Sequence, residues 1–67
     1  MEVTMKAARV NAGLTQRAAA KALEISKNTL SNYENYRTIP DVMISERMAR
    51  LYGLSVDNII FYRRIVL

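Results

Sequence analysis

Five polar side chains recur along one face of a helix that the sequence predicts over residues 27–35. They are Lys27, Asn28, Ser31, Asn32 and Asn35. Solvated helix faces favour Glu, Lys and Gln, whereas Asn and Ser are poor helix formers. Amide side chains pair bidentately with adenine, and a lysine can bind guanine or phosphate. The chemistry of this face therefore favours contact with nucleic acid.

The elements that must hold this face are two helices joined by a three-residue turn. An Ala-rich helix is expected over residues 16–23, followed by the turn and the polar helix. Ala20 suits a close crossing of two backbones, and Ile25 fills the turn. The expected interior positions of this unit are Ala19, Ala20, Leu23, Ile25, Leu30 and Tyr33.

Glycine, proline and short polar residues divide the rest of the chain into helices. Gly13 and Gly53 suit helix C-termini, while Thr15, Ser26 and Asp41 suit N-caps. Ser55 begins a further short helix. We therefore predict an all-α fold in which residues 1–67 form a single domain. Its five helices cover about residues 2–11, 16–23, 27–35, 42–52 and 55–61.

Composition excludes several classes of function. The 67 residues contain neither Cys nor His, so a disulfide framework, a zinc site and an imidazole base are excluded. The net charge of +4 suits a polyanionic partner without proving one. No run approaches the roughly 20 apolar residues of a membrane span. We expect a cytoplasmic protein that is not an enzyme, with no cofactor, metal, membrane or small-molecule ligand.

Residues 5–61 resemble the phage repressor and Cro helix-turn-helix family, and in particular its short single-domain prophage members. The resemblance rests on residues that match in register, namely Leu14-Thr15-Gln16, Ala20, Leu23, Ile25-Ser26, Leu30-Ser31, Tyr33-Glu34-Asn35, Pro40-Asp41-Val42, Met48-Ala49, Leu51-Tyr52-Gly53, Ser55, Asp57 and Ile59-Ile60. It implies a five-helix, lambda-repressor-like DNA-binding domain with the helix-turn-helix at helices two and three. The implied function is that of a transcriptional regulator, a repressor, which reads a palindromic operator in double-stranded DNA as a homodimer.

The resemblance also implies roles for individual residues. Base contacts in the major groove would come from Lys27, Asn28, Ser31 and Asn32. Phosphate contacts would come from Gln16, Thr29, Asn35 and Arg37, and Gln16 would also brace the recognition helix. Arg9 and Glu34 match a partly buried salt bridge that ties helix one to the recognition helix.

Three positions depart from the family pattern. Glu24 and Tyr36 stand where glycine is usual, which leaves the turn and the phosphate-binding loop open to a different path. Ser45 and Glu46 occupy a zone of helix four that is usually aliphatic. None of the three changes the predicted fold.

We interpret the other cationic residues first as solvated surface. Arg17 and Lys21, four apart on helix two, favour a solvated face. Lys6 could reach a phosphate but equally suits generic surface.

Residues 62–67 form an ambiguous tail, which could extend helix five, form a strand or fray. Its apolar side chains need cover. We therefore expect a dimer surface at Ile59, Ile60, Phe61, Ile65, Val66 and Leu67. A rival hypothesis is a protein-interaction module of antitoxin or anti-repressor type, in which the tail binds another protein and DNA binding is secondary.

Overall fold

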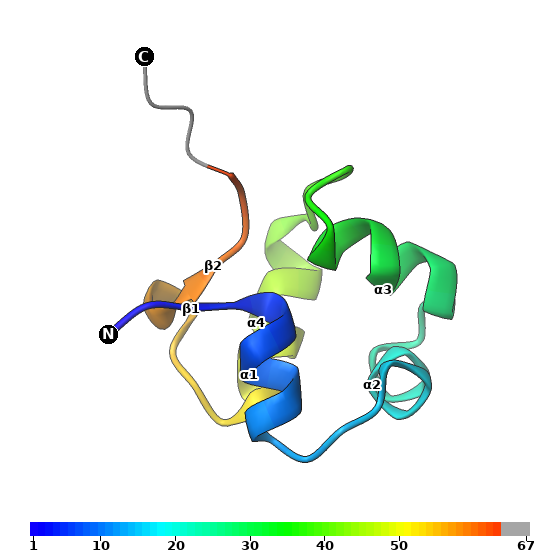
Figure 1. Cartoon of the computed structure of the whole chain (residues 1–67), viewed down its shortest axis with the longest axis horizontal. Helices are drawn as coiled ribbons and strands as arrows, with labels where there is room; N and C mark the ends of the chain where they lie inside the picture. Colours follow the sequence, from blue (N-terminus) through cyan, green and yellow to red (C-terminus); the bar gives the residue numbers. More distant parts are fainter. Residues whose placement is uncertain (64–67) are drawn as a thin grey trace.

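A computed structural model of the chain describes residues 1–63 (Figure 1). The elements are β1 (Val3–Thr4), α1 (Met5–Asn11), α2 (Gln16–Leu23), α3 (Lys27–Glu34), α4 (Val42–Tyr52), the 3-10 helix η1 (Val56–Asn58) and β2 (Ile59–Ile60). Helices α1, α2 and α3 lie around a common centre, and α4 passes behind them. No helix in this part of the chain has the length and apolarity needed to cross a membrane.

Each α-helix starts at a hydroxyl or carboxylate cap. The side chains of Thr4, Thr15, Ser26 and Asp41 accept hydrogen bonds from backbone N–H groups three residues onward, at 2.8–3.0 Å. These bonds satisfy donors that the first helical turn leaves unpaired. The predictions of caps at Thr15, Ser26 and Asp41 are confirmed.

The C-caps of α2 and α4 lie in the left-handed backbone region. Gly53 caps α4 with φ of 73°, as expected for glycine. Glu24 caps α2 with φ of 59°, although it has a side chain, and Tyr36 adopts the same φ in the loop after α3. The chain therefore keeps the left-handed turn at both unusual positions and accepts a cost of about 1 kcal/mol at each.

The prediction of an all-α, five-helix fold is wrong at the two ends of the chain. Residues 56–58 form only a 3-10 turn, and Ile59–Ile60 pair with Val3–Thr4 as a two-stranded parallel sheet. Val3 aligns with Ile59 and Thr4 with Ile60. The β-branched side chains at Val3, Ile59 and Ile60 favour extended backbone, and Thr4 must be extended to cap α1.

The core gathers side chains from α1, α2, α3, α4 and β2. Met5, Leu23, Leu30 and Met48 are its largest fully buried members. Ile25 and Tyr33 are only partly buried but pack against it. Met43, unlike the buried Met5 and Met48, is 62% exposed. Its place in the first turn of α4 turns it away from the packed face.

Candidate nucleic-acid interface

A buried ion pair links α1 to α3. The Arg9 Nε donates to Glu34 Oε2 at 2.7 Å, and Arg9 Nη2 donates to Glu34 Oε1 at 3.3 Å. The Arg9 and Glu34 side chains are 9% and 2% exposed. Arg9 Nη1 also donates to the Leu14 carbonyl at 2.8 Å. Because Glu34 is the last residue of α3, this pair sets where α3 lies against α1.

Gln16 extends this network to α2. Its Nε2 donates to Glu34 Oε1 at 2.9 Å, so the first residue of α2 is bonded to the last residue of α3. A charge-assisted bond of this kind is stronger than a neutral one. The structure therefore shows Gln16 bracing α3.

Tyr52 lies near the ion pair without completing it. The Tyr52 hydroxyl is buried and has no hydrogen-bond partner in the described structure. The pKa of Tyr52 is raised to about 12, chiefly by burial and secondly by the Glu34 carboxylate, while Arg9 opposes the shift. The phenol is therefore neutral at physiological pH, and its oxygen is desolvated without a compensating bond.

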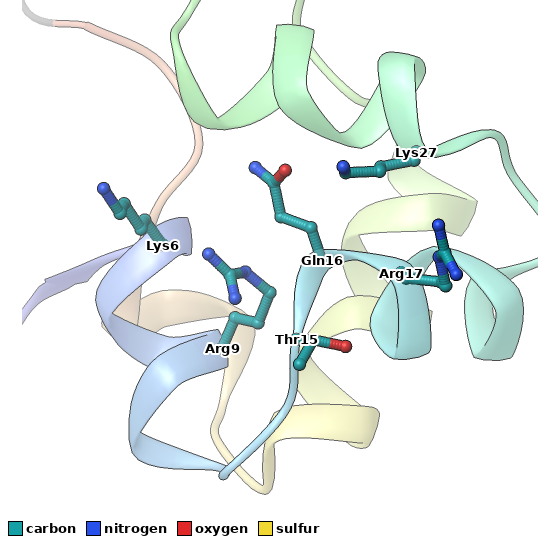
Figure 2. A pocket seen from close by; sticks show the side chains of 6 residues that line it. All are labelled: Lys6, Arg9, Thr15, Gln16, Arg17 and Lys27. Atoms are coloured by element: carbon teal, nitrogen blue, oxygen red, sulfur yellow. The ribbon is translucent and has the colours of Figure 1, made fainter.

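A basic hollow opens between α1, α2 and α3, with a volume of about 630 Å³ (Figure 2). Gln16 rises from the start of α2 toward α3, with Arg9 on one side and Lys27 on the other. We call this site the basic hollow; it is lined by Lys6, Arg9, Thr15, Gln16, Arg17 and Lys27.

The charge of the basic hollow is available to an outside anion. Within residues 1–63, Glu34 neutralises Arg9, whereas Lys6, Arg17 and Lys27 form no ion pair. The first residues of α2 and α3, Gln16 and Lys27, both line the hollow. Helix N-termini add partial positive charge and backbone N–H donors to such a site. The hollow therefore has the chemistry of a phosphate-binding site.

The polar face of α3 is accessible beside the basic hollow. Lys27, Asn28 and Asn35 are exposed, while Ser31 and Asn32 are half-buried. Arg37 Nη1 donates to Asn32 Oδ1 at 3.4 Å, and the Arg37 backbone N–H donates to the Asn32 carbonyl at 2.9 Å. The loop after α3 thus folds back onto the helix and places Arg37 next to Asn32.

Two of the residues expected to contact phosphates already form hydrogen bonds with nearby residues of the chain. Asn35 Nδ2 donates to the Ser31 carbonyl at 2.9 Å and to Ser31 Oγ at 3.3 Å. A phosphate oxygen needs the same N–H groups, so Asn35 would have to release Ser31 to bind one. Thr29 Oγ1 accepts a hydrogen bond from the Ser26 hydroxyl at 2.8 Å, which leaves the Thr29 hydroxyl able to donate.

Lys6 and Arg17 were not among the site residues expected from the sequence. Both were interpreted first as solvated surface, and the fold places them in the basic hollow with Gln16 and Lys27. Lys21, four residues after Arg17, does not line the hollow. The available signal was the position of Arg17 in the first turn of α2, directly after Gln16.

Of the six residues of the expected dimer surface, the structure describes three, and one of these three is buried. Ile59 is 5% exposed and belongs to the core, and Ile60 and Phe61 are partly buried against their own domain. Parallel pairing of β2 with β1 turns Ile59 inward. Ile65, Val66 and Leu67 lie outside the described residues.

Comparison with known proteins assigns the family. The sequence profile of the helix-turn-helix family matches residues 5–59. The chain is 41% identical over 56 residues to the HTH-type transcriptional regulator ImmR of Bacillus subtilis (strain 168). That match covers 84% of this chain and 44% of the relative, so the chain spans less than half the length of that protein. No solved structure matches. The chain therefore belongs to the phage repressor/Cro-type helix-turn-helix family.

Proposed function

We propose that the chain, folded as one domain, is a sequence-specific double-stranded DNA-binding transcriptional regulator. The observation that carries this proposal is the basic hollow beside the exposed amide face of α3. One surface then offers cations for phosphates and amides for base edges. The similarity to a transcriptional regulator supports the same function.

In the proposed complex, α2 and α3 form the helix-turn-helix and α3 enters the major groove. Base edges are contacted by Lys27, Asn28, Ser31 and Asn32. Phosphates on one side are held by Gln16 and Thr29 with the added cations Lys6 and Arg17. Beyond the other end of α3, Arg37 and Asn35 contact the backbone.

One α3 reaches too few base pairs to select a single site in a genome. We therefore propose a homodimer that reads two half-sites of a palindrome, roughly 34 Å apart along the DNA. Occupation of such a site excludes other proteins from it, so the proposed outcome is repression.

In-vitro selection of bound DNA with the purified chain tests this proposal. The expected product is a motif with dyad symmetry. Lys6, Arg17 and Arg37 neutralise phosphates, so the slope of log K against log salt should be about −3 per protomer. A protein-interaction module would show neither an enriched motif nor this slope.

A further inference from the structure

Tyr36 joins the loop after α3 to the C-terminal strand. It stands between Asn35 and Arg37, both of which are proposed to contact phosphates. Its hydroxyl donates to the carbonyl of Ile60, the last residue of β2, at 3.2 Å. Its side chain is half-buried and packs against the core. The proposed phosphate-binding loop is therefore fixed to a strand that comes 24 residues later in the chain.

The backbone of Tyr36 shows what the tyrosine side chain adds. Its φ of 59° lies in the left-handed region, which glycine adopts without strain and which a side chain disfavours. A glycine would therefore suit the backbone of this loop better. It would provide neither the hydroxyl that reaches Ile60 nor an aromatic ring. What tyrosine gains over glycine at this position is its contact with the segment around β2.

Arg63 is held over the ring of Tyr36. Its Cζ atom lies 5.9 Å from the centroid of the ring, within the roughly 6 Å at which a cation is attracted to an aromatic face. Arg63 is exposed, and within residues 1–63 its guanidinium takes part in no ion pair. A contact with a ring leaves the charge and the N–H donors of a guanidinium free to bind an anion.

The position of Arg63 extends the row of proposed phosphate contacts beyond the end of α3. Figure 1 shows the segment after β2 rising past α1 on the side where α3 lies. The Cα atoms of Tyr36 and Arg37 are about 3.8 Å apart. The Arg37 N–H is bonded in turn to the Asn32 carbonyl of α3 at 2.9 Å. Successive phosphates of one DNA strand are separated by roughly 3.4 Å along the helix axis, so two neighbouring cations can each contact one.

We propose that Arg63 is a further phosphate contact of the chain and that Tyr36 is the residue that positions it. This inference rests on the DNA-binding function proposed above. A long side chain that is free in solution loses conformational entropy when it binds a phosphate. Contact with the Tyr36 ring restricts the Arg63 side chain before DNA arrives, so less entropy is lost on binding. The strand that replaces the expected fifth helix thereby brings a cation to the DNA.

Salt titrations of binding to a duplex that carries the selected motif test the contact. Each neutralised phosphate contributes about 0.9 to the slope of log K against log salt. Arg63→Ala should therefore make the slope shallower by about 0.9 per protomer. Arg50→Ala is the matched control and should leave the slope unchanged. It removes the same charge from an exposed position of α4, in a separate hollow beside Ala22 and Leu23.

Tyr36→Gly tests the positioning role. Glycine suits the left-handed φ, so the loop keeps its backbone conformation and loses the ring and the hydroxyl. The slope should become shallower by about 0.9, as in Arg63→Ala, and the double variant Tyr36→Gly, Arg63→Ala should show no further change. Circular dichroism melting measures the folded fraction of each variant. A smaller folded fraction alone would lower the apparent affinity without changing the slope.

The possible contrary outcomes have different meanings. Equal slopes for the unaltered chain and Arg63→Ala would overturn the phosphate contact. An equal change of slope in Arg50→Ala would show that net charge, rather than the place of Arg63, is responsible. Additive changes in the double variant would show that Tyr36 does not position Arg63. If the unaltered chain selects no motif and shows no salt slope, the proposed DNA-binding function itself fails.

Discussion

The regions at the two ends of α3 are built from opposite chemistry. Near its start, Lys27 joins other cationic and polar side chains around the basic hollow. Beyond its end, the loop leads into exposed aliphatic side chains around the start of α4, namely Ile39, Val42 and Met43. Charges without a partner attract anions over a distance, whereas aliphatic side chains gain only on contact. The start of α3 thus borders a surface suited to DNA, whereas the loop after α3 leads to a surface suited to protein.

The largest effect should come from removing the buried charge behind the basic hollow. Glu34→Ala leaves the Arg9 guanidinium buried without its carboxylate and removes the acceptor of Gln16. We expect the free energy of unfolding to fall by about 3–5 kcal/mol, measured by urea denaturation. Val42→Ser, at the exposed start of α4, should change the free energy of unfolding by less than about 0.5 kcal/mol.

A companion variant separates charge burial from packing. Replacing both partners of the ion pair, by Arg9→Met together with Glu34→Met, should restore much of the lost free energy of unfolding, because no unpaired charge stays buried. Equal stability losses for Glu34→Ala and Val42→Ser would contradict the difference drawn between the two regions.

The next effect should be specific to particular bases. Asn28→Ala should weaken DNA binding by about 1–3 kcal/mol at the base pairs that its amide contacts and leave other positions of the motif unchanged. Binding to a panel of single-base-pair variants of the selected site measures this. A uniform loss over the whole panel would instead assign Asn28 to the phosphate backbone.

A smaller, sequence-independent effect should follow from the cations of the basic hollow. Arg17→Ala should weaken binding to all sequences alike and reduce the salt slope by about 1 per protomer. Lys21→Ala is the matched control, because Lys21 is exposed on the same helix but does not line the hollow. Equal effects of the two variants would show that general charge, rather than the hollow, binds the phosphates.

The smallest effect at neutral pH concerns Tyr52. Because the hydroxyl has no partner, Tyr52→Phe should leave the free energy of unfolding nearly unchanged or slightly higher at pH 7. A clear loss at pH 7 would show that the hydroxyl takes part in the Arg9–Glu34 network.

At high pH the free energies of unfolding of the unaltered chain and of Tyr52→Phe should diverge. The folded-state pKa of Tyr52 is raised to about 12, above its ordinary value of 10.0, so between these values the unfolded chain loses the phenol proton first. The stability that this group contributes is complete below pH 10 and falls as pH rises toward 12. Tyr52→Phe should lack this component in denaturation curves across that window.

Local sequence signals were enough to place most helix ends. Thr15, Ser26 and Asp41 act through bonds to N–H groups three residues away, so their role can be read without knowing the fold. The same holds for Gly53, whose left-handed backbone ends α4. The polar face of α3 follows equally from helical periodicity.

The errors lie where distant segments meet. Ile59 pairs with Val3, 56 residues earlier in the chain, and this pairing replaced the expected fifth helix with a strand and turned Ile59 inward. Helix-start signals at Ser55 and Asp57 were real, but they produced only a 3-10 turn. Strand pairing outweighed them because β-branched residues on both sides favour the extended backbone.

By itself, the sequence determined most of the boundaries of the α-helices, the capping residues and the amide-rich face of α3, because each depends on residues within about one helical turn. Only the tertiary structure decided that Lys6 and Arg17 join Gln16 and Lys27 in one hollow, and that aliphatic side chains remain exposed at the start of α4. Those outcomes depend on how α1, α2, α3 and α4 pack together. Packing is a property of the whole chain that no local pattern encodes.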